Sequence, residues 1–367
     1  MKITLSVIKA DIGSVGGHIT PSSEVLREVE DFISTEGSGL VIDHHIAHTG
    51  DDISILLTHQ QGEDSAEIHQ LGWDAFQAGT KVAESEGLYG AGQDLLSDAF
   101  SGNVKGLGPA VAELSFEERP SEPFLFFMAD KTEPGAYNLP FYLSYADPMY
   151  NPGLMLSPKM EEGFVFTVMD VENTENDRVI ELTVPEDIYD LACLLRDNGR
   201  FVVESIRSAK TGEPTVSCST TRLNKIAGEY VGKDDPVALA RVQKNFPATG
   251  ELLAPYSIGH YVAGFMRGSH NGPLMPVTED GTISYFDGPP VVSCLAFSLS
   301  DGELTEPVDV FDHPFWDQVR QKVSRKAVEL REQGFSGPAM LDYKELEYGG
   351  ITKRMDDLDE DFEIREE

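Results

Sequence analysis

The sequence predicts a mixed α/β or α+β protein that folds as one compact unit. Apolar runs typical of strands alternate with segments of helical periodicity along the chain. The chain has 367 residues, 40% of them hydrophobic and 9% aromatic, so it can bury a substantial core as one large domain or two. Because no internal repeat or low-complexity linker divides it, we expect one compact unit built of mixed strands and helices.

Five runs are predicted to be strands. Residues 2–8, "KITLSVI", alternate polar and apolar, and the strand is expected to end near Asp11. The others are "ISILLTH" (53–59), "FLFFMAD" (124–130), "GFVFTVMDV" (163–171) and "VVSCLAFSLS" (291–300). Three strands carry aspartates at a polar end, namely Asp11, the pair Asp51 and Asp52, and Asp130.

Helices are predicted between these strands. Thr20 and Pro21 are a suitable N-cap and first turn for "SSEVLREVEDFIS", whose apolar residues fall on one face. Comparable periodicity predicts helices over 64–86, 185–197, 236–246 and 314–333. For the helix over 236–246, Asp235 before Pro236 would be the N-cap.

The chain is strongly acidic, with 63 acidic residues against 28 basic ones and a formal charge of −35. The last thirteen residues, "MDDLDEDFEIREE", hold only a small part of this charge, so the acidity belongs to the whole surface. Such a surface opposes nucleic acid and anionic membranes. We expect one catalytic domain over 1–354 and an acidic tail over 355–367, the one segment that could be disordered.

The cysteines and the apolar runs bear on location. Cys193, Cys218 and Cys294 are widely spaced and form no metal or redox motif, so we expect buried thiols in a reducing compartment. No apolar run reaches transmembrane length, and "MKITLSVIKADIG" lacks the form of a signal peptide. A soluble, cytoplasmic protein is the expectation.

The strand-end aspartates are candidates for a metal site. Asp51 and Asp52 alone would mean little, because solvated acid pairs are common. Asp11 and Asp130 also lie where an apolar strand gives way to a loop, and such loops concentrate catalytic groups. Converging carboxylates would repel one another without a cation between them, and oxygen-rich sites suit Mg²⁺.

Two further patterns are weaker. "DIGSVGGHITPS" (11–22) places three glycines and His18 before a helix, where backbone amides could hold a phosphate or simply form a tight turn. His44 and His48 stand at i, i+4 spacing, but no third zinc ligand follows at a recognisable spacing, so packing or capping histidines are the better interpretation.

"EYVGKDDP" (229–236) places Tyr230, Lys233, Asp234 and Asp235 together. Two carboxylates should keep the lysine protonated, and a protonated lysine is no nucleophile. If Mg²⁺ occupied the carboxylates, the local charge would favour the neutral amine, which can form a Schiff base. The alternative is an ordinary charged turn that begins a helix.

With "EYVGKDDP", "GSHNGPLMPV" (268–277) and "DIGSVGGH", the chain resembles the bifunctional archaeal and bacterial fructose-1,6-bisphosphate aldolase/phosphatase family from about Met1 to Tyr348. The resemblance implies a four-layer α-β-β-α sandwich, a homo-octamer and dependence on several Mg²⁺ ions. It also implies a gluconeogenic activity that condenses dihydroxyacetone phosphate with glyceraldehyde 3-phosphate, then removes the C1 phosphate to give fructose 6-phosphate.

The resemblance also assigns roles to residues. It implies Lys233 as the Schiff-base nucleophile, Tyr230 as its acid/base partner and Asp11 as a proton acceptor in phosphate release. His18 is implied as a ligand of metal or substrate. The implied metal ligands are Asp11, His18, Asp51, Asp52, Gln93, Asp130, Asp234 and Asp235. The implied substrate contacts are His18, Tyr89, Gly102, Asn103, Lys131, Gln243, Lys244, Arg267, Asp287 and Tyr348.

Two other functions stay open. The first is a Mg²⁺-dependent sugar-bisphosphate phosphatase without aldolase activity, in which Lys233 only binds phosphate. The second is an acidic cation-buffering or scaffold protein, which would explain the charge but not the aspartates at the strand ends.

Overall fold

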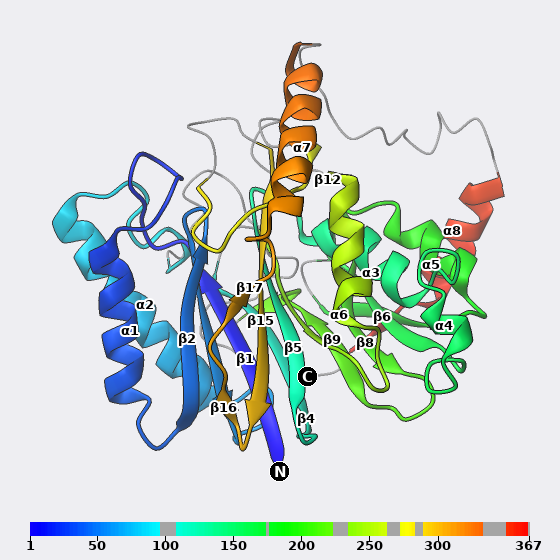
Figure 1. Cartoon of the computed structure of the whole chain (residues 1–367), viewed down its shortest axis with the longest axis horizontal. Helices are drawn as coiled ribbons and strands as arrows, with labels where there is room; N and C mark the ends of the chain where they lie inside the picture. Colours follow the sequence, from blue (N-terminus) through cyan, green and yellow to red (C-terminus); the bar gives the residue numbers. More distant parts are fainter. Residues whose placement is uncertain are drawn as a thin grey trace.

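Figure 1 presents the computed structural model of the chain, which describes residues 1–95, 108–173, 176–222, 234–262, 272–282, 289–332 and 350–365. The first sheet is antiparallel throughout, in the order β10-β4-β1-β3-β2. Its strands are β1 (Lys2–Ala10), β2 (Val41–Thr49), β3 (Asp52–His59), β4 (Ala110–Glu117) and β10 (Thr221–Arg222).

The second sheet is larger, in the order β14-β15-β5-β11-β9-β8-β6-β7-β18, with β16 and β17 also pairing with β15. Its strands are β5 (Glu122–Asp130), β6 (Phe164–Asp170), β7 (Arg178–Val184), β8 (Phe201–Ser208), β9 (Pro214–Cys218), β11 (Val237–Arg241), β14 (Met275–Pro276), β15 (Val291–Ser300), β16 (Glu303–Leu304), β17 (Val308–Asp309) and β18 (Glu363–Ile364). A separate ribbon pairs β12 (Tyr261–Val262) with β13 (Gly272–Pro273).

Helices cover the outer face of each sheet (Figure 1). On the first sheet lie α1 (Ser23–Glu36) and α2 (Ala66–Glu86). The other helices are α3 (Asn138–Tyr145), α4 (Gly153–Leu156), α5 (Ile188–Leu195), α6 (Thr249–Leu253), α7 (Pro314–Glu332) and α8 (Gly350–Asp361), with 3₁₀ turns η1 (Gln93–Leu95), η3 (Pro134–Tyr137) and η4 (Ala254–Ile258).

Strand periodicity creates the layers. In β1, Leu5 and Val7 face the second sheet, whereas Ile8 faces α1 and α2. In β5, Phe126 meets the first sheet, and Phe127 packs in the outer cluster with residues of α3 and η4. The result is the expected four-layer α-β-β-α sandwich, with one apolar core between the sheets and one beneath each helical layer.

Most predicted elements are confirmed within a few residues, and one is wrong. The helix expected over 236–246 is instead strand β11. Val237 and Leu239 face the first sheet while Ala238 and Ala240 face the outer helices, so the run is apolar on both faces and lacks the alternation of a half-buried strand. His44 and His48, noted for their i, i+4 spacing, both lie on strand β2 and not on a helix.

Two helix-start predictions also differ. Asp235 does not cap a helix, because it has a left-handed backbone (φ +51°) and leads into β11. The N-cap of α1 is Ser22, whose side chain accepts from the Val25 N–H, and not Thr20. With Ser22 as the cap, the helix begins at Ser23, and Pro21 lies before the cap instead of in the first helical turn.

The acidic tail, which we expected could be disordered, is structured in the described residues. Met355 and Leu358 of α8 are buried in the outer core of the second sheet. After the helix, β18 pairs with β7. Apolar side chains at three- and four-residue spacing thus give even this acidic segment a packing face.

The membrane and cysteine expectations can be compared with the same residues. No helix in the described part of the chain is long and apolar enough to cross a membrane. Cys193, Cys218 and Cys294 are buried free thiols.

Candidate active site

The topology brings the strand-end aspartates together. Ala10 of β1 pairs with Ile53 of β3, so Asp11 follows β1 next to the β2–β3 turn that carries Asp51. In the second sheet, Val237 pairs with Met128, which places the start of β11 beside the end of β5. Because the sheets are stacked, all these ends meet at one edge of the sandwich.

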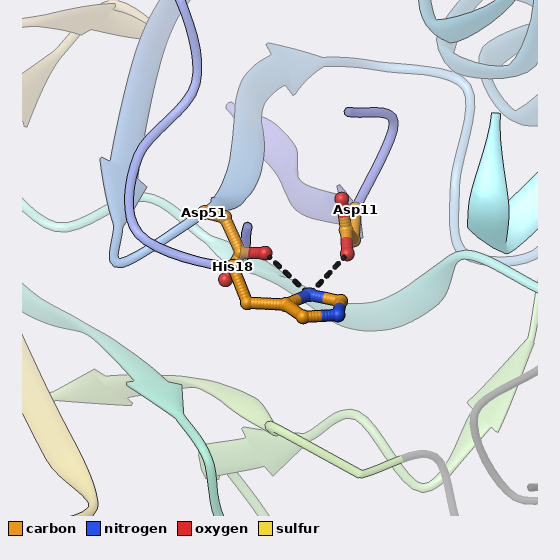
Figure 2. Close-up of side chains that lie close together, drawn as sticks. All are labelled: Asp11, His18 and Asp51. Carbon is orange, nitrogen blue, oxygen red and sulfur yellow. Dashed lines mark hydrogen bonds and ion pairs between the residues drawn. The ribbon is translucent and has the colours of Figure 1, made fainter. Parts of the chain in front are cut away.

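The first group consists of Asp11, His18 and Asp51 (Figure 2). His18 Nδ1 lies 3.0 Å from Asp51 Oδ2 and 3.6 Å from Asp11 Oδ2, so it points between the two carboxylates. The His18 backbone is left-handed, with φ +62°, and its N–H donates to Ser14 Oγ at 2.8 Å. The glycine-bearing loop is therefore a tight turn that folds His18 back over the end of β1.

The second group consists of Asp52, Asp130 and Asp235, each offering one oxygen within 4.8 Å of the others. The backbone of Asp235 exchanges a hydrogen bond with Thr132, whose carbonyl accepts the Asp235 N–H at 3.0 Å. In return, Asp235 Oδ1 accepts the Thr132 N–H at 2.6 Å. These bonds hold Asp235 against the segment that follows β5.

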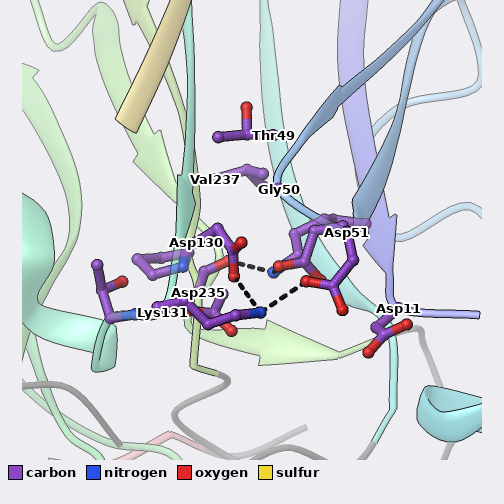
Figure 3. A network of polar contacts seen from close by, with 12 residues as sticks. Asp11, Thr49, Gly50, Asp51, Asp130, Lys131, Asp235 and Val237 are labelled. Atoms are coloured by element: carbon purple, nitrogen blue, oxygen red, sulfur yellow. Dashed lines mark hydrogen bonds and ion pairs between the residues drawn. The ribbon is translucent and has the colours of Figure 1, made fainter. Parts of the chain in front are cut away.

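Lys131 joins the two groups (Figure 3). Its Nζ lies 2.6 Å from Asp51 Oδ1 and 2.8 Å from Asp130 Oδ1. The Lys131 side chain is buried, where water screens charges only weakly. Its ammonium therefore partly neutralises two carboxylates that would otherwise repel one another.

Gly50 allows Asp130 to occupy this position. The glycine forms the β2–β3 turn with φ +59°, and a Cβ added there would lie only 1.6 Å from Asp130 Oδ2. Both the left-handed backbone and the close approach therefore require glycine. Figure 3 shows Gly50 between Thr49 and the aspartates.

The electrostatics of the site are strongly perturbed. Burial and the neighbouring Asp51 raise the pKa of Asp11 to about 7. Burial likewise raises the pKa of Asp235 to about 8 and that of Asp130 well above its usual range. For Asp51, burial opposes ionisation, but Lys131 and His18 outweigh it and hold its pKa well below the usual value. Burial lowers the pKa of His18, but its bonds to Asp11 and Asp51 prevail and raise it to about 10.

The donor set fits a hard divalent cation. Both groups are rich in carboxylate oxygens, the ligands that Mg²⁺ prefers. Buried Asp130 Oδ2 accepts no hydrogen bond from the described residues, and the same holds for Gln93 Oε1. Buried oxygens without donors are costly unless a cation or water meets them. His18 is the one donor of a softer type.

The other predicted site residues in the described chain are placed unevenly. Asp234 is buried directly before Asp235. Gln93 begins η1, next to the Asp94 that binds the backbone of Asp11. Tyr89 is half exposed and contacts the edge of the His18 ring at a centroid distance of 4.9 Å. Gln93 and Tyr89 therefore both lie near the first group.

Gln243 and Lys244 are not brought to this site within one chain. They follow the far end of β11, and Lys244 Nζ donates to the Pro120 carbonyl beside the start of β5. At about 3.3 Å per residue, the strand separates them from Asp235 by on the order of 15 Å or more. The remaining predicted residues lie outside the described residues, namely Tyr230, Lys233, Gly102, Asn103, Arg267, Asp287 and Tyr348.

Two supporting residues were missed by the sequence reasoning. Asp94 Oδ2 accepts the Asp11 N–H at 2.8 Å, and the Asp94 N–H donates to the Asp11 carbonyl at 3.0 Å. Lys9 is buried on β1 and lies 2.9 Å from Asp52 Oδ2. Its sequence signal was available, since Lys9 continues the inward register of Ile3, Leu5 and Val7.

The fold and the site together define a sandwich protein with a buried acidic centre, rich in oxygen donors, at the edge of its two sheets. A family model described as fructose-1,6-bisphosphatase matches residues 2–363, and the chain belongs to that family.

Individual relatives are similar over almost the full length. A Thermus thermophilus protein named fructose-1,6-bisphosphate aldolase/phosphatase is 57% identical over 362 residues, covering 99% of this chain and all of the relative. Proteins of the same name from Cenarchaeum symbiosum and Methanothermobacter marburgensis are 51% and 46% identical. They cover 98% and 99% of this chain, and 94% and 99% of their own lengths.

Proposed function

We propose that this chain is a bifunctional gluconeogenic enzyme. It would condense dihydroxyacetone phosphate with glyceraldehyde 3-phosphate and then hydrolyse the C1 phosphate of fructose 1,6-bisphosphate, leaving fructose 6-phosphate and phosphate. The observation that carries the proposal is the convergence of five aspartates on one edge, with Asp235 only two residues after Lys233 in the sequence. The names of the full-length relatives support the same pair of activities.

The aldol half is assigned to Lys233 and Tyr230. The neutral amine of Lys233 would attack the ketone carbon of dihydroxyacetone phosphate and expel water as the Schiff base forms. Tyr230 would transfer the protons that this step and the following carbon–carbon bond formation require. Both residues belong to the segment that enters β11 through Asp235, so the aldol chemistry would take place beside the acidic groups.

The phosphatase half is assigned to the acidic groups. Bound Mg²⁺ would polarise the C1 phosphate and stabilise the leaving oxygen. The residues that would hold it are Asp11, Asp51, Asp52, Asp130, Asp234 and Asp235, together with Gln93 and His18. Asp11, at the end of β1 beside Asp51, is assigned as the acceptor of the proton from the attacking water. Tyr89 would contact the sugar phosphate next to His18.

Lys131 would bind a substrate phosphate. In the structure its ammonium occupies the space between Asp51 and Asp130, so it supplies positive charge where an anionic substrate must approach an acidic protein. The other assigned phosphate contacts, Arg267 and Lys244, would add to this charge.

A homo-oligomer forms part of the proposal. Gln243 and Lys244 lie at the far end of β11, so a second copy would have to bring them to the substrate. The homo-octamer implied by the resemblance would satisfy this requirement. A cytoplasmic location is favoured by the three free cysteines.

The test is to supply both triose phosphates with Mg²⁺ and to compare the wild type with Lys233→Ala. The proposal predicts fructose 6-phosphate and phosphate from the wild type. The variant should lose carbon–carbon bond formation while still releasing phosphate from fructose 1,6-bisphosphate. The control is Lys159→Ala, which removes an exposed lysine distant from Lys233 in the sequence. A phosphatase alone would release phosphate from the bisphosphate but never from the trioses.

A further inference from the structure

Lys9 is a buried lysine in an apolar row. Side chains of β1 alternate, and Ile3, Leu5 and Val7 face the core between the sheets. Lys9 is the next residue in this register and is only 1% exposed. Burying an ammonium there is costly unless its partners are well placed, so its contacts must offset that cost.

Those contacts join the two sheets. Lys9 Nζ lies 2.9 Å from Asp52 Oδ2, at the start of β3 in the first sheet. It also donates to the backbone carbonyl of Asp235 at 2.6 Å, just before β11 in the second sheet. One ammonium thus connects a metal-site carboxylate to the peptide that follows the "KDD" sequence.

The peptide it holds has an unusual conformation. Asp235 adopts φ +51°, a left-handed backbone that costs a non-glycine residue free energy unless its surroundings fix it. Thr132 binds the Asp235 N–H and one carboxylate oxygen, and Lys9 binds the carbonyl. All three polar groups of this residue are therefore restrained, two by Thr132 just after β5 and one by Lys9 of β1.

We propose that Lys9 is a positioning residue, which fixes Asp235, two residues after Lys233 in the sequence, relative to the candidate metal ligand Asp52. The inference rests on the proposed function for its kinetic consequences. Its structural part, the tie between Asp52 and Asp235, is independent of that function.

Magnesium binding separates positioning from charge. Replacing Lys9 by methionine removes a positive charge beside carboxylates, and on charge alone Mg²⁺ should then bind more tightly. If Lys9 positions Asp235 and Asp52, the same replacement should weaken binding. We expect a loss of about tenfold in Mg²⁺ affinity by titration calorimetry, with Lys2→Met, on the exposed end of the same strand, unchanged. Unchanged or tighter binding in Lys9→Met would overturn the proposal.

A second variant covers the case in which Lys9→Met does not fold. Lys9→Arg keeps the charge, but its planar guanidinium is longer and cannot reproduce contacts at 2.9 and 2.6 Å. Borohydride trapping of dihydroxyacetone phosphate on Lys233, followed by mass spectrometry, should slow at least tenfold. Trapping at the wild-type rate would refute positioning. If the wild type itself traps no triose phosphate, the proposed aldolase activity fails, while the magnesium comparison still decides the role of Lys9.

Discussion

The Gly50→Ala substitution tests how the site is built. The new methyl group would lie 1.6 Å from Asp130 Oδ2 and 2.7 Å from its Cγ. Because unbonded heavy atoms settle near 3.5 Å, the carboxylate would have to move by roughly 2 Å. That movement would break the 2.8 Å ion pair with Lys131 and withdraw an oxygen from the second acidic group.

Two effects contribute to the expected loss. Alanine at φ +59° costs about 1–2 kcal/mol in the backbone alone. Misplacing a ligand by more than 1 Å should weaken Mg²⁺ binding by at least about tenfold, or about 1.4 kcal/mol. Titration calorimetry measures the binding, and thermal unfolding measures the stability.

Gly62→Ala is the matched control for Gly50→Ala. Gly62 has φ +84°, but a Cβ added there meets no atom within 4 Å. It should therefore lose a similar amount of backbone stability and bind Mg²⁺ as the wild type does. If Gly50→Ala bound Mg²⁺ as tightly as Gly62→Ala, Asp130 would not be a ligand held in place by the turn.

Three further outcomes are expected. Because burial raises the pKa values of Asp11 and Asp235 from 3.8 to about 7 and about 8, the folded metal-free protein holds protons that the unfolded chain loses. That stabilisation is complete below pH 3.8 and is lost as the pH rises toward 8, so the Tm of the metal-free protein should fall between pH 5 and 8. Mg²⁺ should bind with release of these protons, seen as binding heats that depend on the buffer. A flat Tm and buffer-independent heats would contradict the raised pKa values of Asp11 and Asp235. Asp170→Asn should lower the free energy of unfolding by about 2–4 kcal/mol in a denaturant titration, because buried Asp170 pairs with Arg178 and Arg200, and Arg178 also binds Asp359 of α8. The control Arg207→Gln breaks an exposed pair with Glu181 and should lower it by less than about 1 kcal/mol. Equal losses would refute a stabilising role for the buried Asp170 pairs. Asp94→Asn should weaken Mg²⁺ binding less than Asp11→Asn does, since Asp94 acts through the backbone of Asp11, and a larger effect of Asp94→Asn would make Asp94 a direct ligand.

Local patterns predicted the elements that end at the site. The alternation in β1 and the apolar run of β5 placed Asp11 and Asp130 correctly at strand ends. Strand β11 was mistaken for a helix, because a strand buried on both faces shows a continuous apolar run, and the proline after Asp235 imitated a helix start.

Long-range geometry accounts for what the sequence could not predict. The contact of Lys9 with the Asp235 carbonyl joins residues 226 positions apart, and no spacing rule encodes it. The requirement for glycine at position 50 depends on where Asp130 lies in the other sheet. The separation of Lys244 from the aspartates likewise follows from the direction of β11 rather than from closeness in sequence.

The most direct measurement is phosphate release from a mixture of dihydroxyacetone phosphate and glyceraldehyde 3-phosphate with Mg²⁺, with and without the protein. Phosphate appearing together with fructose 6-phosphate requires both half-reactions, and this is the result that the proposed function predicts. Phosphate from fructose 1,6-bisphosphate but none from the trioses would contradict it. Lys233 would then have no role as a nucleophile, and the protein would be a phosphatase only.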